Sequence, residues 1–155
     1  KKKEKKMKLV NALAQRSNLQ MRLIELENRL KNNAKVLEGE EPAEKPEDLL
    51  KEMDDTLSQL EVLMTKINLV NSTTYKDGVS LTQMLALRDC LKMRMKMMRN
   101  FLDAASCKVD RYSKTEIPIK SSVNVSELQK EVDHYAKELR QLDEMIQELN
   151  WTTEI

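Results

Sequence analysis

Residues 46–71 read PEDLLKEMDDTLSQLEVLMTKINLVN. Seam positions follow one another in this stretch at alternating spacings of three and four: Leu50, Met53, Leu57, Leu60, Met64, Ile67 and Asn71. Such heptads are typical of helices that pack knobs into holes along one seam. Proline suits the first turn of a helix, and the acidic residues that follow it favour the positive end of the helix dipole. The pattern therefore predicts a long helix from Pro46 to about Ser72.

Similar spacings predict three further long helices. They run from about Met7 to Leu37, from a capping box at Ser80 to about Lys108, and from a capping box at Ser126 to about Asn150. Between the last two, apolar residues alternate with polar ones, which is the period of a strand: Ile117, Ile119, Val123 and Val125. We therefore expect a mainly all-α fold, an elongated antiparallel bundle of four long helices with one short β segment or hairpin between helices 3 and 4.

The short turn at Asp77-Gly78 makes the helices on either side of it antiparallel neighbours, with Asn71 opposite Leu81 and Leu50 opposite Leu102. The third helix has its own seam at Leu81, Met84, Arg88, Leu91, Met95, Met98, Leu102 and Ala105. A second stripe lies roughly opposite: Ala86, Cys90, Met93, Met97, Phe101 and Ala104. A helix with two apolar faces is sandwiched, so this helix is either the centre of the bundle or part of a subunit interface.

Composition narrows the class of protein. The 155 residues include 2 Gly and 3 Pro, which excludes a turn-rich sheet protein and a glycine-rich nucleotide fold. Lys+Arg 27 nearly balances Asp+Glu 26, so net charge gives no general attraction to nucleic acid or membranes. Aromatic residues are 3 %, too few for an aromatic-lined ligand pocket. Cys90 and Cys107 fit no metal spacing, and we expect free thiols that act as small core residues in a reducing compartment.

The chain is expected to form one domain over residues 7–155, preceded by a disordered basic tail at residues 1–6. Two origins of the tail are open. It is either a solvated basic segment, or a translated ribosome-binding sequence upstream of a native start at Met7, since Lys3-Glu4 can be encoded AAG-GAG. No apolar run long enough for a signal peptide or a membrane-spanning helix is present, so we expect a cytoplasmic location.

Candidate sites are few, and none is catalytic, cofactor-binding or metal-binding. The single histidine, His134, has no further ligands at metal spacing, so we expect it to be solvated or at an interface. Arg88 occupies a seam position and needs a partner if it is buried. In the expected register it forms a polar cluster between helices with Asn68, Asn71 and Asp89. This cluster is interpreted either as a structural layer that fixes register or as a small polar or anion site.

Surplus apolar residues predict that the chain associates with itself. The candidate oligomer face consists of Met93, Met97, Phe101, Ile117, Ile119 and Trp151. Trp151 follows the last helix, and we expect it to dock on the bundle or on a neighbouring subunit. The first hypothesis is a cytoplasmic structural or protein-interaction module without catalysis. We expect other proteins as possible further partners and no small-molecule substrate.

The run Lys92-Met93-Arg94-Met95-Lys96-Met97-Met98-Arg99 leaves alternatives open. A basic, methionine-rich helix is also found in proteins that touch membranes or RNA. Aromatic residues for base stacking are not interleaved with the bases, which disfavours the RNA reading. We therefore expect the methionines to fill two apolar faces and the bases to lie beside acidic residues.

Several motifs together resemble one family of small bacterial proteins. They are Asn32–Val36 with Glu38–Pro42, Ile67-Asn68, Asn71, Asp77-Gly78, Leu81-Thr82, Arg88-Asp89, Arg111–Ser113, Glu116-Ile117, Leu128–Lys130 and Leu149–Thr153. From Met7 to its end the chain resembles the septicolysin-like family, and Leu149–Thr153 is the most specific motif. The family's name implies a membrane-active, pore-forming cytolysin, and it carries over no catalytic residue. The sequence itself shows no Trp-rich membrane loop, so the cytolysin is the alternative to the interaction module.

Overall fold

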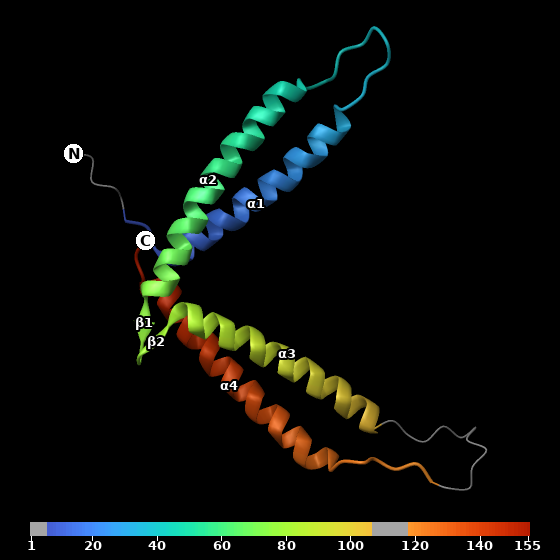
Figure 1. Ribbon diagram of the computed structural model, residues 1–155, viewed down its shortest axis with the longest axis vertical. Helices are drawn as coiled ribbons and strands as arrows, with labels where there is room; N and C mark the ends of the chain where they lie inside the picture. The colour runs from blue at the N-terminus through green and yellow to red at the C-terminus, as the bar shows by residue number, and fades with distance from the viewer. Residues whose placement is uncertain (1–5, 107–117) are drawn as a thin grey trace. The chain divides into compact units, whose positions relative to one another are not determined.

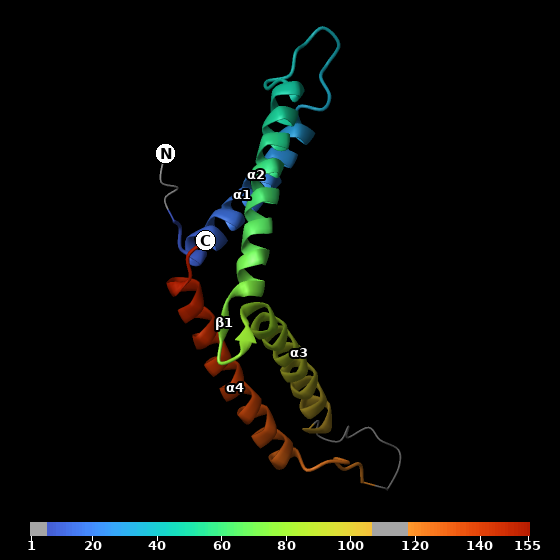
Figure 2. The same cartoon turned by 60° about the vertical axis from the view of Figure 1, so that its left-hand side comes forward.

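The computed structural model describes residues 6–106 and 118–155. The described residues form four helices, α1 (Leu9–Asn32), α2 (Pro46–Thr73), α3 (Leu81–Ser106) and α4 (Val125–Thr152). A small hairpin of β1 (Tyr75–Lys76) and β2 (Val79–Ser80) lies between α2 and α3. In two views α1 runs beside α2, and α3 runs beside α4 (Figure 1, Figure 2). The expected mainly all-α fold with four long helices is confirmed.

The chain divides into two compact units. Unit 1 contains the residues up to Leu81 together with Leu149–Ile155, and unit 2 contains Thr82–Glu148. Each unit is built around one pair of antiparallel helices, α1 with α2 in unit 1 and α3 with α4 in unit 2. A pair of helices can bury one stripe on each member, and this leaves the remaining faces of each helix to solvent.

The core of unit 1 lies between α1 and α2. Its buried side chains are Leu9, Ala12, Leu19 and Leu26 from α1, and Leu49, Thr56, Leu60, Leu63 and Ile67 from α2. The buried Thr56 hydroxyl donates to the Glu52 carbonyl oxygen at 2.7 Å, which satisfies its hydrogen bond within the helix.

The predicted seam of α2 is wrong by one residue at three of its positions. Leu50, Leu57 and Met64 are 46 %, 45 % and 40 % exposed, whereas the residues just before each of them are buried. One residue turns an α-helix by about 100°, so the packed face lies to one side of the predicted one. The predicted register paired this seam with the seam of the third helix. That pairing is wrong, because α2 packs against α1 in unit 1 and α3 runs beside α4 in unit 2.

One bidentate ion pair and an asparagine connect the linker after α1 to the end of that helix. Arg29 donates from Nε to Glu44 Oε2 at 3.1 Å and from a second nitrogen to Glu44 Oε1, so the pair is bidentate. The pKa of the Glu44 carboxyl is lowered, chiefly by the hydrogen bond from Arg29. Asn33 donates to the Arg29 carbonyl oxygen and accepts from the Glu44 backbone amide at 3.0 Å. The linker after α1 is thus tied to the end of that helix.

The first and last described residues of unit 1 pair with each other. Lys8 and Glu154 form an antiparallel bridge, and the Leu9 amide donates to the Thr153 carbonyl at 2.9 Å. Lys6 and Lys8 lie 3.4 Å and 3.6 Å from the Glu154 carboxylate. The hydrogen bond from Lys6 is the largest cause of the lowered pKa of Glu154. Of the expected basic tail, residues 1–5 lie outside the described residues.

The hairpin corrects the expected position of the β segment. Strands β1 and β2 pair as Tyr75 with Ser80 and Lys76 with Val79, around the turn at Asp77 and Gly78. Both turn residues have positive φ, 52° and 78°, the combination that a type I′ hairpin turn requires. Residues 118–124, the described part of the segment expected to be β, contain no strand. Among the described residues, no strand lies beside this segment for it to pair with. Ile117 lies outside the described residues.

The core of unit 2 follows the predicted seam of the third helix. It contains Met84, Leu91, Met95 and Leu102 from α3, and Val132, Leu142 and Ile146 from α4. The α4 helix begins one residue before its predicted capping box, and Asn124 accepts the Glu127 backbone amide at 3.2 Å. This bond supplies the N-terminal cap.

Candidate interaction surface

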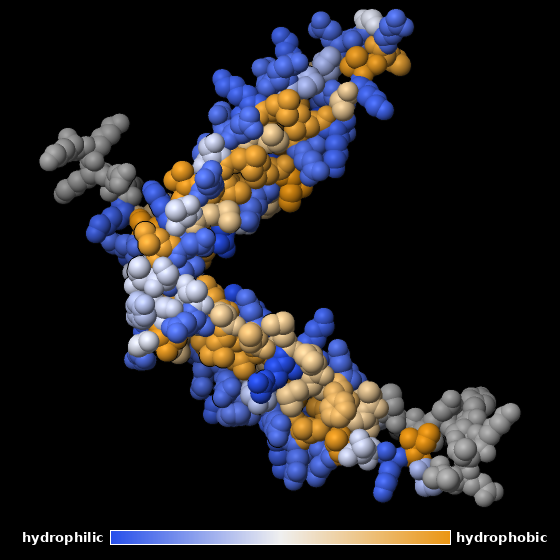
Figure 3. All heavy atoms as spheres, viewed as in Figure 1, coloured by the Kyte–Doolittle hydropathy of each residue, from blue (hydrophilic) through white to orange (hydrophobic). Residues whose placement is uncertain are grey.

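One side of α3 is apolar and exposed. We call it the α3 outer face and define it as Cys90, Met93, Met97 and Phe101. Their spacing of three and four places them on one face, opposite the buried Met84, Leu91 and Leu102. Met93, Met97 and Phe101 are 58 %, 72 % and 49 % exposed, and Figure 3 shows apolar atoms gathered along this part of unit 2. The second stripe predicted from sequence is therefore present, and no described helix of unit 2 covers it.

Cys90 belongs to this face, not to the core as expected. Its thiol is free and exposed. The interpretation as a small core residue failed because α4 covers only the opposite side of α3. Cys107 lies outside the described residues.

Basic side chains stand on both edges of the α3 outer face. Arg94 donates from one guanidinium nitrogen to the Tyr135 hydroxyl at 2.8 Å, and its guanidinium carbon lies 4.9 Å from the centre of that ring. On the other edge, Lys92, Lys96 and Arg99 are exposed and line a shallow pocket of about 210 Å³ against α4. A partner of the α3 outer face would thus meet an apolar centre with positive flanks.

The predicted polar cluster is divided between the two units. Arg88 is half-buried, and its nearest carboxylates are Asp89 at 3.7 Å and Asp143 at 4.0 Å. Its Nε is buried and makes no hydrogen bond. Asn68 is exposed and Asn71 half-buried, both on α2 in unit 1. Arg88 therefore has its ion-pair partners within unit 2, and Asp143 on α4 is the partner that sequence reasoning missed.

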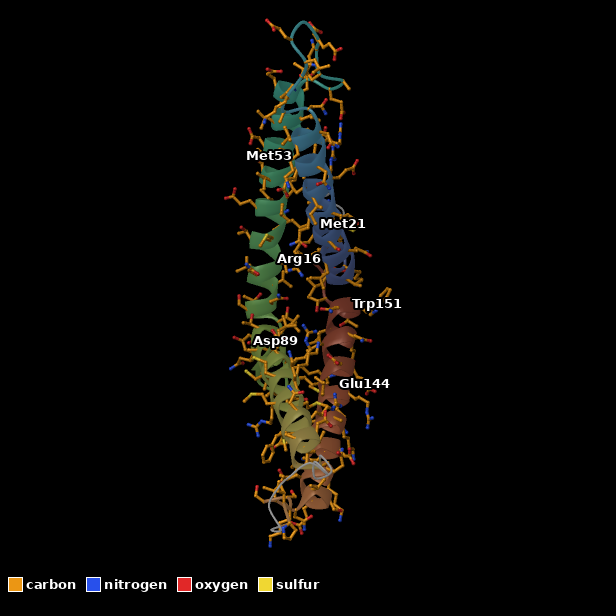
Figure 4. All side chains as sticks on the ribbon, turned by 90° about the vertical axis from the view of Figure 1, so that its right-hand side faces the viewer. Arg16, Met21, Met53, Asp89, Glu144 and Trp151 are labelled. Carbon is orange, nitrogen blue, oxygen red and sulfur yellow. The ribbon has the colours of Figure 1, made fainter. Side chains whose placement is uncertain are left out.

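Two further members of the predicted oligomer face, Ile119 and Trp151, are also exposed. Ile119 is 62 % exposed, and Trp151 is 66 % exposed near the end of α4. Figure 4 shows the Trp151 side chain projecting away from its helix. Trp151 is therefore not docked on its own chain, and the alternative, that it docks on a neighbouring subunit, stays a prediction. His134 is exposed as expected and lies 3.2 Å from Glu138.

Unit 1 contains a groove that the sequence did not indicate. It has a volume of about 910 Å³ and is lined by residues of α1 and α2 and by residues near both ends of the chain, among them Met7, Val62, Leu63, Leu69 and Ile155. Val62 and Leu69 are 58 % and 63 % exposed. The α2 heptads gave no signal for it, because these residues stand outside the seam positions.

The described residues contain neither a metal-binding cluster nor a helix that could span a membrane. Within residues 6–106 and 118–155, no three His, Cys, Asp or Glu side chains gather closely enough to hold a metal ion. No helix in the same ranges has the length and apolarity needed to span a membrane.

Comparison with known proteins gives a family and a structural neighbour. A crystal structure of a functionally unknown conserved protein from Corynebacterium diphtheriae is 39 % identical in sequence, with a TM-score of 0.90 over 97 % of this chain and 99 % of that chain. The comparison with curated proteins gives no match. Neither description that does match mentions a cytolysin, and the septicolysin-like resemblance stays a prediction. The model of a family of unknown function, DUF6847, matches residues 4–155, and the chain belongs to that family.

Proposed function

We propose that this protein is a non-catalytic helical interaction module that binds a second copy of itself through the α3 outer face. The observation that carries the proposal is the row Met93, Met97 and Phe101, 58 %, 72 % and 49 % exposed on a well-formed helix. Burying a large apolar side chain fully stabilises by about 1.5–3 kcal/mol, so leaving three of them in water is costly unless a partner covers them. Contiguous exposed patches of this kind mark interaction sites.

The residue types suit a protein partner. Methionine is flexible and polarizable, so it adapts to the shape of a facing helix, and phenylalanine supplies a large buried area. A cytoplasmic location is part of the proposal, because the exposed free thiol of Cys90 suits a reducing compartment.

The test is the oligomeric state of a Met97→Glu variant. A carboxylate at the centre of an apolar interface lacks a partner, so we expect this variant to dissociate at micromolar concentrations at which the unsubstituted protein is a dimer. The matched control is Leu37→Glu, since Leu37 and Met97 are each 72 % exposed and Leu37 lies in the linker after α1. Light scattering coupled to size-exclusion chromatography reports the mass. Equal dissociation constants for the Met97→Glu and Leu37→Glu dimers would contradict the proposal.

The same face supports membrane binding as a second candidate. A helix with Met and Phe on one face and Lys and Arg beside it has the composition of helices that lie on anionic membranes. This candidate also accommodates the septicolysin-like resemblance. Leakage of dye from vesicles of anionic lipid, abolished by Met97→Glu and retained by Leu37→Glu, would favour it over self-association.

RNA binding has less support. Arg94 is already engaged by Tyr135, and this leaves Lys92, Lys96 and Arg99 as the bases of the run that are unpaired among the described residues. Salt-dependent RNA binding that weakens when these three residues are neutralised would revive it.

A further inference from the structure

A second helix of this chain carries an exposed face with the opposite charge. We call it the α2 outer row and define it as Glu47, Leu50, Asp54, Leu57, Glu61 and Met64. Leu50, Leu57 and Met64 are 46 %, 45 % and 40 % exposed, and Asp54 and Glu61, which alternate with them, are exposed as well. Leu50, Leu57 and Met64 are the predicted seam positions that α1 leaves uncovered. The row therefore combines apolar anchors with a line of carboxylates along one helix face.

The carboxylates of this row are unpaired within the described part of the chain. Glu47, Asp54 and Glu61 form no side-chain ion pair there, unlike Glu44 and Glu52, which pair with Arg29 and Arg22. Lys96, on the edge of the α3 outer face, also has no ion-pair partner among residues 6–106 and 118–155. Unpaired charges of opposite sign thus flank two apolar helix faces.

We propose that the α2 outer row of one copy docks on the α3 outer face of a second copy. Charge complementarity argues for this occupant. Four bases flank the α3 outer face (Lys92, Arg94, Lys96 and Arg99) against two exposed acids of the same helix (Asp89 and Asp103), so two α3 outer faces would repel each other, whereas the acidic row attracts one. Spacing agrees, because Leu50, Leu57 and Met64 recur every seven residues, as do Cys90 and Met97. This is helix-on-helix recognition, in which apolar anchors supply affinity and flanking charges select the partner.

The proposed dimer has two-fold symmetry, so that the α2 outer row of each chain meets the α3 outer face of the other and the contact forms twice. The inference rests on the proposed function, since it names the surface that covers the α3 outer face during self-association.

Charge reversal tests the pairing. Lys96→Glu places a carboxylate against the acidic row, and Asp54→Lys places an ammonium against the basic edge. Each variant alone suffers the repulsion twice per dimer, so we expect the dissociation constant to rise about tenfold or more. Lys130→Glu and Glu144→Lys, at exposed positions of α4, are the matched controls and should leave it unchanged. Circular dichroism confirms equal helicity, and the milder Lys96→Gln and Asp54→Asn variants should weaken the dimer less.

Mixing the two single variants gives the sharpest result. In the mixed dimer, the carboxylate introduced at position 96 of one chain meets the ammonium introduced at position 54 of the other. The second contact of the same dimer keeps the original pair of Lys96 and Asp54. We therefore expect sedimentation velocity to show dimers in the mixture at concentrations where each variant alone is monomeric.

Three results would overturn the inference. Charge variants that dimerise like the unsubstituted protein, while Met97→Glu is monomeric, would refute this pairing and leave the proposed function standing. Recovery only when both substitutions share one chain, and not on mixing, would place the contact within a single chain. An unsubstituted protein that is monomeric would refute the proposed function and the inference together.

Discussion

Arg88 is a charged residue at a heptad seam position, where an apolar residue is expected. Its side chain is 29 % exposed, its Nε is buried without a hydrogen bond, and its nearest carboxylates stand 3.7 Å and 4.0 Å away. Ion pairs at these distances gain little, while withdrawing a guanidinium from water is costly. At the scale of the residue, Arg88 therefore costs unit 2 stability.

We expect Arg88→Met to leave the free energy of unfolding unchanged or to raise it by about 1 kcal/mol, because methionine fills the same space without a charge. Urea denaturation followed by circular dichroism measures the change. A loss of about 2 kcal/mol or more would show instead that the ion pairs with Asp89 and Asp143 hold unit 2 together.

Glu44 gives a prediction that depends on pH. Its hydrogen bonds from Arg29 lower the pKa of the carboxyl in the folded state, so the pair stabilises the protein above the unfolded pKa of about 4.3 and ceases to do so as the pH falls through the folded value. We expect Glu44→Gln to lower the urea midpoint at pH 7. The difference in midpoint from the unsubstituted protein should shrink as the pH falls toward 3. Glu38→Gln, in the same linker, is the control. A difference that stays constant over this pH range would contradict the assignment.

At the scale of the elements, α2 shows how far the sequence determines a packed face. Its start at Pro46 and its length were predictable from capping residues and periodicity. The side of the helix that packs was not predictable, because two possible heptad seams share Met53, Leu60 and Ile67. Adjacent apolar residues such as Leu49 and Leu50 fit one seam each. The choice is made by α1, which covers the seam that includes Thr56. The packing partner therefore selects the seam, and the sequence of α2 alone does not identify that partner.

Both apolar stripes of α3 were predictable, because each keeps a constant heptad phase along the helix and the two lie roughly opposite each other. Trp151 and Asp143 were harder, since their surroundings depend on how α4 meets its neighbours and not on its own sequence.

The sequence predicts the turn of the hairpin but not its two strands. Asp77-Gly78 predicts the turn, whereas two-residue strands are too short to show an alternation.

We expect Gly78→Ala to lower the free energy of unfolding by about 1 kcal/mol. The φ of Gly78 is 78°, which disfavours any side chain, although no atom lies within 4 Å of the position that a Cβ would occupy. Asp77→Asn, which tolerates the same backbone region, should change little. Thermal unfolding compares the two, and equal midpoints would contradict a strained turn.

At the scale of the whole molecule, each unit is a helix pair that buries one stripe per helix. The α3 outer face in unit 2 and the α2 outer row in unit 1 are what these pairs leave exposed, and their charges are opposite. Both surfaces are explained if two copies of the chain cover them for each other. The family and the structural neighbour are both described as functionally unknown, so the proposed function depends on this association.

Sedimentation equilibrium of the unsubstituted protein tests it most directly. We predict a reversible monomer–dimer equilibrium at micromolar concentrations, weakened by added salt because charged edges contribute to the contact. A single species with the mass of one 18.1 kDa chain, at every concentration up to the millimolar range, would contradict it.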